Sequence, residues 1–362
     1  RAGPPRLIPR RAVHDAAHSR SNNFDALRLI AALLVIWGHQ FAIMGQPVPL
    51  MWHNEPGAVG VVLFFAISGY LVTISWQADP HLLRFAARRA LRIWPGLCAA
   101  VLLCAALLGP LVSTLPATDY WLHPLTREYF ANLWLDTRYA LPGVFDGNPF
   151  PSSVNGPLWT IPLEVTCYAA LAVLGMLGLM RLRPFAPLLL LALTATLQWR
   201  YSPPPGQPMP AWSPLLQYAI MFALGASLAC WRAVWLPRRL LTAAVLVALL
   251  LLLRLAGPAL IAGQVPLLIL ATLGVIWGTA STPLLHRAGR WGDFSYGLYI
   301  YAFPVQQLIV WAYANQLGFA TALGLSLGGA LLLAALSWHL LEKPALAFKP
   351  RRAGPTGAAV AA

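Results

Sequence analysis

The chain has 362 residues, of which 59% are hydrophobic and 10% are charged, and its mean hydropathy is +0.65. Soluble domains carry about a quarter charged residues, so this composition excludes an ordinary soluble enzyme. The apolar content also excludes a disordered chain. The net charge of +14 would favour nucleic acid in a soluble protein. We expect no nucleic-acid partner here, because in a membrane protein the placement of charge matters more than its sum.

The predicted elements in chain order begin with a basic, proline-containing tail over residues 1–24. Apolar segments follow, most of them near the roughly 20 residues needed to cross a bilayer. They cover 27–45, 57–76, 96–115, 157–180, 185–199, 213–231, 240–256, 259–280, 294–313 and 320–341. A second basic tail covers 346–362. The sequence therefore predicts an all-α, polytopic transmembrane helical bundle of about ten spans, with its membrane domain over 25–345.

The basic residues predict the orientation of this bundle. With a cytoplasmic N-terminus, every Lys and Arg falls on the cytoplasmic side except Arg127, Arg138, Arg200 and Arg254. Positive charge collects on that side of membrane proteins. We therefore expect both the N- and C-termini to be cytoplasmic.

The cysteines and the longest outer segment are two further places where a ligand could bind. The cysteines, Cys98, Cys104, Cys167 and Cys230, lie in apolar stretches without Cys-x-x-Cys spacing, so no metal site is expected. The longest outer segment, about 116–156, is rich in aromatic residues and carboxylates. Such a composition suits carbohydrate binding, but an aromatic belt at the membrane surface uses the same residues.

Ionisable residues inside a membrane are costly and mark functional sites. His39 and Glu164 lie well inside the first and fourth predicted spans. Counted from the outer ends of their spans, both lie about 9–12 Å deep, so the two side chains are predicted to meet. A carboxylate beside an imidazole suits a general base. A buried polar pair that joins two helices, or part of an ion pathway, remains the alternative.

Arginines gather on one face of the segment RFAARRALRIWP after the second span. Arg84, Arg88 and Arg92 recur every four residues, with Arg89 beside them, as on a short helix. Guanidinium groups match phosphate oxygens, so the cluster fits a polyanion. A topological signal without a ligand is the alternative. Arg28, three turns before His39, is predicted at the cytoplasmic surface.

Six segments, in order, resemble the acyltransferase-3 family of membrane O-acyltransferases over about residues 24–345. They are FDALRLIAALLVIWGH, VVLFFAISGYLV, RFAARRALRIWP, NGPLWTIPLEVTCY, GDFSYGLYIYAFP and LLEKP. Besides those named above, the motif positions are Ser68, Gly69, Trp159, Tyr168, Ser295, Tyr296, Tyr299, Pro304, Glu342, Lys343 and Pro344. One position departs from the pattern: Ala302 stands where many relatives carry a histidine.

The resemblance implies transfer of an acyl group, usually acetyl, from cytoplasmic acyl-CoA to a hydroxyl of an extracytoplasmic sugar or cell-surface polysaccharide such as lipopolysaccharide. His39 would be the base or the acyl carrier, and Glu164 would orient it. Arg28 and the arginine cluster would bind the CoA phosphates. The supporting residues would be Ser68, Trp159, Tyr168, Ser295, Tyr296 and Tyr299.

The same resemblance implies a multi-pass protein of the bacterial inner membrane. Acyl-CoA is expected as a substrate, with no permanently bound cofactor and no metal. Because many relatives carry an added esterase-like domain that this sequence lacks, we expect it to act alone or with separate envelope-synthesis proteins. A transporter or flippase of a glycan or lipid-linked precursor is the alternative, since polar groups at mid-depth and broken helices serve transport as well.

Overall fold

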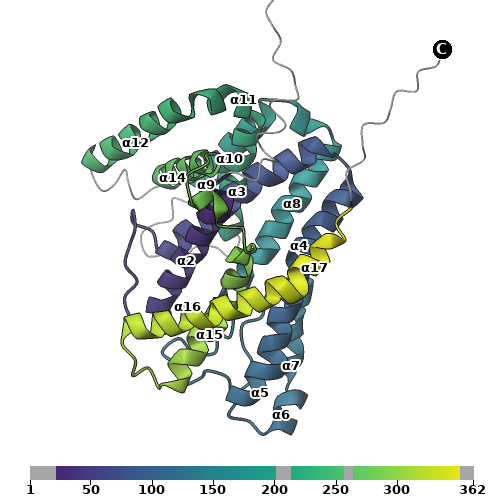
Figure 1. The fold of residues 1–362 in the computed structure, drawn as a ribbon, viewed down its shortest axis with the longest axis vertical. Coiled ribbons are helices and arrows are strands. Elements are labelled where there is room, and N and C mark those ends of the chain that lie inside the picture. The colour runs from purple at the N-terminus through teal and green to yellow at the C-terminus, as the bar shows by residue number, and fades with distance from the viewer. Residues whose placement is uncertain (1–21, 201–212, 257–263, 351–362) are drawn as a thin grey trace, which may run out of the picture.

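We describe the protein from a computed structural model that covers residues 22–200, 213–256 and 264–350. These residues form helices and connecting segments without a β-sheet, as the sequence predicts (Figure 1). Residues 1–21 and 351–362, which make up most of the two predicted tails, lie outside the described residues. The short link between the predicted segments 240–256 and 259–280, with the first residues of the second, lies outside them too.

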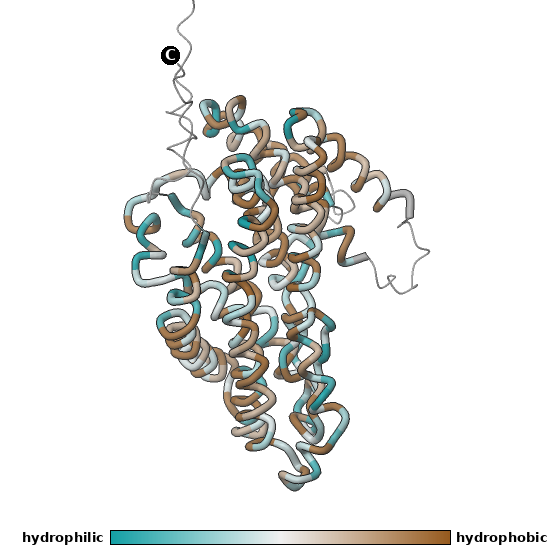
Figure 2. Tube along the Cα trace, turned by 90° about the vertical axis from the view of Figure 1, so that its right-hand side faces the viewer, coloured by the Kyte–Doolittle hydropathy of each residue, from teal (hydrophilic) through white to brown (hydrophobic). Residues whose placement is uncertain are grey.

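Each predicted apolar segment overlaps a helix in the described residues, but the helix at the third segment, 96–115, begins at Leu82. The long helices are α2 (Phe24–Ile43), α3 (Pro56–Ala78), α4 (Leu82–Leu102), α8 (Thr160–Met176), α9 (Phe185–Arg200), α10 (Ser213–Cys230), α12 (Arg239–Ala256), α14 (Gln264–Gly278), α15 (Phe294–Ala312) and α16 (Phe319–Ser337). The short helix α17 (Lys343–Ala347) continues α16 through a π-helical turn, Trp338–Glu342. Hydrophobic residues cover much of these helices (Figure 2).

Six helical stretches in the described residues are long and apolar enough to cross a membrane. They are Phe24–Ile43, Pro56–Ala78, Leu82–Val112, Gly156–Met176, Arg232–Ala256 and Phe319–Ala347. The protein is therefore a multi-pass membrane protein by length and composition of its helices. Crossing by all ten segments and the cytoplasmic position of the termini stay predictions.

Most of the arginines lie at one end of the bundle, which we call the basic end. Hydrogen bonds join helix ends there: Asn23 Nδ2 donates to Thr282 Oγ1 at 2.7 Å, and Arg232 Nη1 donates to Gln77 Oε1 at 2.7 Å. Trp231 Nε1 donates to the Arg183 carbonyl at 2.8 Å. The start of α2 and the ends of α3, α10 and α14 therefore lie at the same end, together with the α8–α9 connection.

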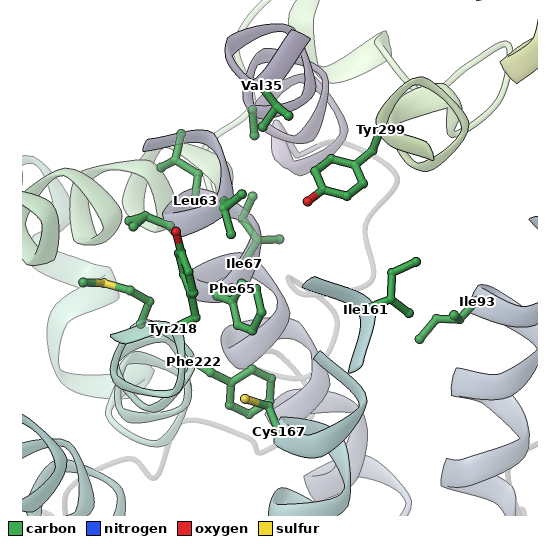
Figure 3. Packing of buried hydrophobic residues seen from close by; sticks show 14 of the residues in the cluster. Val35, Leu63, Phe65, Ile67, Ile93, Ile161, Cys167, Tyr218, Phe222 and Tyr299 are labelled. Carbon is green, nitrogen blue, oxygen red and sulfur yellow. The ribbon is translucent and has the colours of Figure 1, made fainter. Parts of the chain in front are cut away.

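Helix α3 lies at the centre of the bundle and packs closely against α10. A Cβ atom added at Gly69 would come within 2.0 Å of the Phe222 carbonyl oxygen. Small residues let membrane helices approach in this way. Phe65 of α3 lies beside Tyr218 of α10, with ring centroids 5.1 Å apart (Figure 3). This packing fixes the turn of α3 that carries Ser68.

The sequence predicts a short separate helix for the arginine segment, but the segment does not form one. It forms the first turns of one continuous helical stretch, Leu82–Val112, which passes from α4 through a π-helical part, η1 (Leu103–Leu108), into α5 (Gly109–Val112). Pro95, the last residue of RFAARRALRIWP, lies within α4 and does not end the helix. The arginines are therefore held rigidly with respect to the third span.

The outer segment folds back along this long helix. It contains α6 (Ala117–Leu122) and α7 (Pro124–Tyr129), which lie beside α5 at one end of the molecule (Figure 1). Tyr120 donates its hydroxyl to the Ala105 carbonyl at 2.7 Å, and Trp94 Nε1 donates to the Leu133 carbonyl at 3.2 Å. A π-helical turn leaves one backbone carbonyl without its hydrogen bond inside the helix, and the Tyr120 hydroxyl donates a hydrogen bond to the Ala105 carbonyl in its place.

Candidate active site

A cavity of about 110 Å³ lies inside the bundle. Five helices, α2, α3, α4, α8 and α15, contribute to its wall. Its polar and charged lining residues are Arg28, Ser68, Arg89, Arg92, Thr160, Glu164, Tyr168, Ser295, Tyr296 and Tyr299. Nine of the residues that the resemblance singled out therefore meet at one place. This volume is large enough for ordered water or a small acyl group.

Glu164 lies at the centre of the polar wall of the cavity. Ser68 Oγ donates to Glu164 Oε1 at 2.9 Å, and the Tyr168 hydroxyl donates to the same oxygen. Tyr168 lies one turn after Glu164 on α8, so both project from one helix face. The close approach of α3 to α10 brings Ser68 to that face. The three side chains form a hydrogen-bonded group inside an apolar bundle.

The arginines on α4 have different partners. Arg92 Nη2 lies 2.6 Å from Asp293 Oδ2, and Arg92 Nη1 lies 3.7 Å from Glu342 Oε2. The Arg89 guanidinium stands over the rings of Tyr168 and Phe85, 5.8 and 6.0 Å from their centroids. In the part of the chain that the structure describes, Arg89 is the α4 arginine without a carboxylate in ion-pair distance.

Asp293, just before α15, joins two of the cavity arginines. Its Oδ2 lies 3.5 Å from Arg28 Nη1 in addition to the contact with Arg92, and Ser295 Oγ donates to its Oδ1 at 2.5 Å. Burial alone would raise the pKa of this carboxyl, but the two guanidinium groups outweigh burial and hold the pKa at about 2. Asp293 is therefore ionised at neutral pH and fixes α2, α4 and α15 relative to one another.

Arg84 and Arg88 do not line the cavity. Arg84 Nη2 lies 2.6 Å from Asp79 Oδ1, and Arg88 Nη1 lies 2.7 Å from Asp79 Oδ2. Hydrogen bonds from Arg84, and then from Arg88, hold the pKa of Asp79 well below its usual range despite burial. This carboxylate joins the end of α3 to the start of α4, which gives two of the four clustered arginines a structural contact.

The tyrosines of α15 bind neighbouring helices. Tyr296 donates its hydroxyl to the Ile93 carbonyl at 2.8 Å, and the Tyr299 hydroxyl lies 2.8 Å from Thr160 Oγ1. In Figure 3, Tyr299 projects from α15 into the space between α2, α3 and α8. Trp159 does not line the cavity and instead packs on Tyr218, with ring centroids 5.6 Å apart.

His39 lies apart from the cavity, and the predicted pairing of His39 with Glu164 is wrong. The half-buried imidazole packs edge-on against Phe303, with ring centroids 5.2 Å apart. In the described residues no hydrogen bond joins His39 to Glu164, whose partners are Ser68 and Tyr168. Phe303 follows Tyr299 by one turn of α15, so His39 lies beyond the Tyr299 end of the cavity.

The error comes from the different levels at which the helices begin. Gly38, next to His39, packs against Gly57, whereas Glu164 bonds to Ser68. Gly57 and Ser68 are separated by eleven residues of α3, or about 16 Å along its axis. The helical stretch Gly156–Met176 begins deeper in the bundle than α3. The predicted depths of His39 and Glu164 are counted from the outer ends of their spans, which assumes that both spans begin at the same level.

Sequence reasoning missed the carboxylates that hold the arginines. These residues are Asp79, Asp293 and Glu342. Asp293 and Glu342 lie inside the motifs GDFSYGLYIYAFP and LLEKP, and this position was the available signal. In the described ranges no group of three or more His, Cys, Asp or Glu residues is arranged to hold a metal ion.

A charged and hydrogen-bonded cavity enclosed by apolar membrane helices is the kind of site that membrane-embedded enzymes and transporters share. Comparison with known proteins distinguishes these classes. The profile described as an acyltransferase domain, that of the acyltransferase-3 family, matches residues 21–339. The chain belongs to this family.

Two curated relatives support the assignment. The chain is 31% identical over 328 residues to a protein of Shigella phage Sf6 named O-acetyl transferase, covering 90% of this chain and 96% of the phage protein. It is 33% identical over 171 residues to Nodulation protein 10 of Rhizobium leguminosarum bv. viciae, covering 44% and 45% of the two chains. No solved structure matches the chain.

Proposed function

We propose that the protein transfers an acyl group, acetyl in the simplest case, from acyl-CoA at the basic end to a hydroxyl group of an acceptor at the opposite end. Family membership and the phage relative named O-acetyl transferase support an O-acyltransferase. The observation that carries the proposal is the enclosed cavity, in which Arg89 has no carboxylate partner among the described residues and faces a hydrogen-bonded glutamate. A carrier of neutral sugars has no need for such a cation.

The donor would enter with its diphosphate at the basic end of the cavity. Arg89 would bind it first, because its charge is not matched by a carboxylate, and Arg28 and Arg92 would assist. Arg28 and His39 are separated by eleven residues, or about 16 Å along α2. The pantetheine arm contains about a dozen bonds and spans on the order of 15 Å when extended. A diphosphate near Arg28 would therefore bring the thioester to the level of His39.

Arg84 and Arg88 would act through Asp79 by fixing the start of α4, on which Arg89 and Arg92 lie. Direct phosphate binding by Arg84 and Arg88 stays a prediction, and it would require them to leave Asp79. We assign these different roles because Arg84 and Arg88 are paired with Asp79, whereas Arg89 and Arg92 line the cavity.

His39 would serve as the general base for the transfer. The acceptor hydroxyl oxygen would attack the thioester carbonyl while His39 takes the hydroxyl proton. The C–S bond would then break, and the imidazolium would return the proton to the CoA sulfur. An acyl-imidazole formed on His39 before the acceptor attacks remains a second route to the same products.

The group around Glu164 would shape the passage of the donor rather than orient His39. Glu164 accepts hydrogen bonds from Ser68 and Tyr168 and lies beside Arg89 across the Tyr168 ring. Its carboxylate would keep the polar passage hydrated. Tyr299, at the end of the cavity toward His39, would be the nearest hydroxyl donor for the developing oxyanion, with Ser295 and Tyr296 farther back.

The acceptor would approach past the folded outer segment, from the side opposite the basic end. Exposed aromatic residues of this segment, such as Trp121 and Trp134, offer flat surfaces for a sugar. We propose a sugar hydroxyl of a cell-surface polysaccharide as the acceptor. We also propose a location in the cytoplasmic membrane, with separate envelope-synthesis proteins that supply the acceptor.

The proposal is tested by acetyl-CoA turnover in nanodiscs, with surface polysaccharide of the source organism as the acceptor. The assay follows acetyl transfer and CoA thiol release by wild type, by His39→Ala, and by the matched control His123→Ala in the outer segment. We expect His39→Ala to lower kcat at least 100-fold, because general bases contribute about 10²–10⁴-fold. Equal rates in the two variants would remove His39 from the chemistry, and absence of acetyl-CoA binding in wild type would refute the donor.

Arginine variants separate donor binding from chemistry. Arg89→Ala is expected to raise the KM for acetyl-CoA with a smaller change in kcat, because it removes a binding interaction. Arg238→Ala is the control, since this exposed arginine at the basic end lies outside the cavity. An unchanged KM in Arg89→Ala would show that the cavity does not receive the phosphates.

A further inference from the structure

A second and larger cavity lies at the basic end. Its volume is about 340 Å³, and residues from the ends of α3, α8 and α10 and from the α8–α9 connection line it. They are Trp76, Gln77, Pro80, Gly175, Met180, Arg181, Arg183 and Cys230. The mechanism proposed above gives this cavity no role.

The two arginines of this second cavity have no counter-charge, unlike Arg28 and Arg92 of the first cavity. Neither Arg181 nor Arg183 has a carboxylate within 4.0 Å among the described residues, and both are exposed. By contrast, Asp79 and Asp293 together bind four arginines near the first cavity. Guanidinium groups that are free of carboxylates are the ones available to an incoming phosphate.

The backbone that carries these arginines is fixed. Trp231 Nε1 donates to the Arg183 carbonyl at 2.8 Å, and Gly178 makes the turn after α8 with φ of +76°. A third guanidinium lies at the edge, where Arg232 is held by Gln77 Oε1 at 2.7 Å. The cavity is therefore a formed concave site with cationic side chains on a positioned backbone.

The second cavity also continues the line of the first. On α3, Val72 lines the first cavity and Trp76, one turn later, lines the second. The Phe85 ring contacts lining residues of both cavities: its centroid is 6.0 Å from the Arg89 guanidinium and 5.2 Å from the Trp76 ring. A ligand that carries phosphate groups on both sides of a ribose fits this order of sites, with one phosphate at Arg89 and the other in the second cavity.

We infer that the second cavity binds the 3′-phosphorylated nucleoside of the CoA donor, with Arg181 and Arg183 as ligands of the 3′-phosphate. This inference rests on the proposed function, in which the diphosphate lies near Arg89. The nucleoside then occupies the space beside Trp76, and the pantetheine arm continues through the first cavity toward His39. A phospholipid headgroup carries the same phosphate chemistry and is the competing source.

The test compares CoA with dephospho-CoA, which lacks only the 3′-phosphate. Cys230 lies in the cavity wall and reports occupancy through protection from N-ethylmaleimide, measured by mass spectrometry of its peptide. The protein is held in nanodiscs of phosphatidylcholine. In wild type we expect CoA to protect Cys230 at a concentration at least tenfold lower than dephospho-CoA. Arg181→Ala/Arg183→Ala is expected to abolish this ratio, whereas the control Arg238→Ala preserves it.

The outcomes distinguish a CoA nucleoside site, a lipid headgroup site and a failure of the proposed function. A preserved ratio in Arg181→Ala/Arg183→Ala, with CoA still bound and turned over, overturns the inference and leaves the proposed function intact. Protection of Cys230 by phosphatidylglycerol in the nanodisc, but not by CoA, assigns the cavity to a lipid headgroup. A wild type that neither binds CoA nor transfers acetyl refutes the proposed function itself. Arg181→Lys/Arg183→Lys, which keeps the charge, should retain part of the ratio and controls for loss of folding.

Discussion

Replacing Asp79 by asparagine removes the carboxylate that joins α3 to α4. The Asp79 side chain is 6% exposed and contacts the guanidinium groups of Arg84 and Arg88 at 2.6 and 2.7 Å. The Arg88 side chain is 9% exposed, and its Nε and Nη2 have no other hydrogen-bond partner in the described residues. Asp79→Asn therefore leaves a buried cation without a counter-charge.

The structure gives the size of the expected effect. Removing one partner of a buried ion pair costs about 3–5 kcal/mol. We expect about 3 kcal/mol, the low end, because Arg84 is partly exposed and its released charge can be hydrated. For a chain of this length the corresponding fall in the thermal transition is roughly 5 °C. The start of α4 should also loosen, which raises the KM for the acyl donor.

The assay is thermal unfolding in detergent, followed by circular dichroism. Asp136→Asn is the matched control, because Asp136 pairs with Arg138 at 2.7 Å but both side chains are about half exposed. Exposed pairs contribute about 0–1 kcal/mol, so the control should shift the transition little. Equal thermal transition temperatures for Asp79→Asn and Asp136→Asn would refute the structural role assigned to Asp79.

Two further predictions concern the outer segment and the junction at Asp293. Tyr120→Phe is expected to destabilise the protein by about 1–3 kcal/mol in the same assay, because the Ala105 carbonyl loses its donor; a change below about 0.5 kcal/mol would contradict this. Burial raises the pKa of Asp293, but Arg92 and Arg28 outweigh burial and hold this pKa at about 2. The carboxylate therefore stabilises the fold above about pH 4 and loses this effect as pH falls toward 2. That stabilisation is about 2 kcal/mol, so Asp293→Asn should lower stability at neutral pH and reduce the loss of stability between pH 4 and 2, to which the Asp79 carboxyl also contributes. An acid dependence as steep in the variant as in wild type would contradict the assignment.

The helical class and the positions of the long helices follow from the sequence, because apolar runs of bilayer length leave few alternatives to helices. The resemblance also named Ser68, Glu164, Tyr168 and Tyr299 as site residues, and the structure places all four at one cavity. It did not give their contacts: Glu164 was expected beside His39, whereas Ser68 and Tyr168 are its partners.

The partners of the arginines were not predictable in the same way. Arg92 and Asp293 are 201 residues apart, and no local pattern pairs them. The relative levels of His39 and Glu164 depend on where each helix begins, and contacts between distant segments, such as Ser68 with Glu164, set these levels. Such long-range contacts carry no periodic signal in one sequence.

The most direct test of the central claim uses proteoliposomes in which the basic end faces a compartment that contains acetyl-CoA. The polysaccharide acceptor is supplied only on the opposite side. We expect acetyl groups to appear on the acceptor with wild type and with His123→Ala, and to fall at least 100-fold with His39→Ala. Transfer that requires both substrates on the same side, or that persists in His39→Ala, would contradict the account.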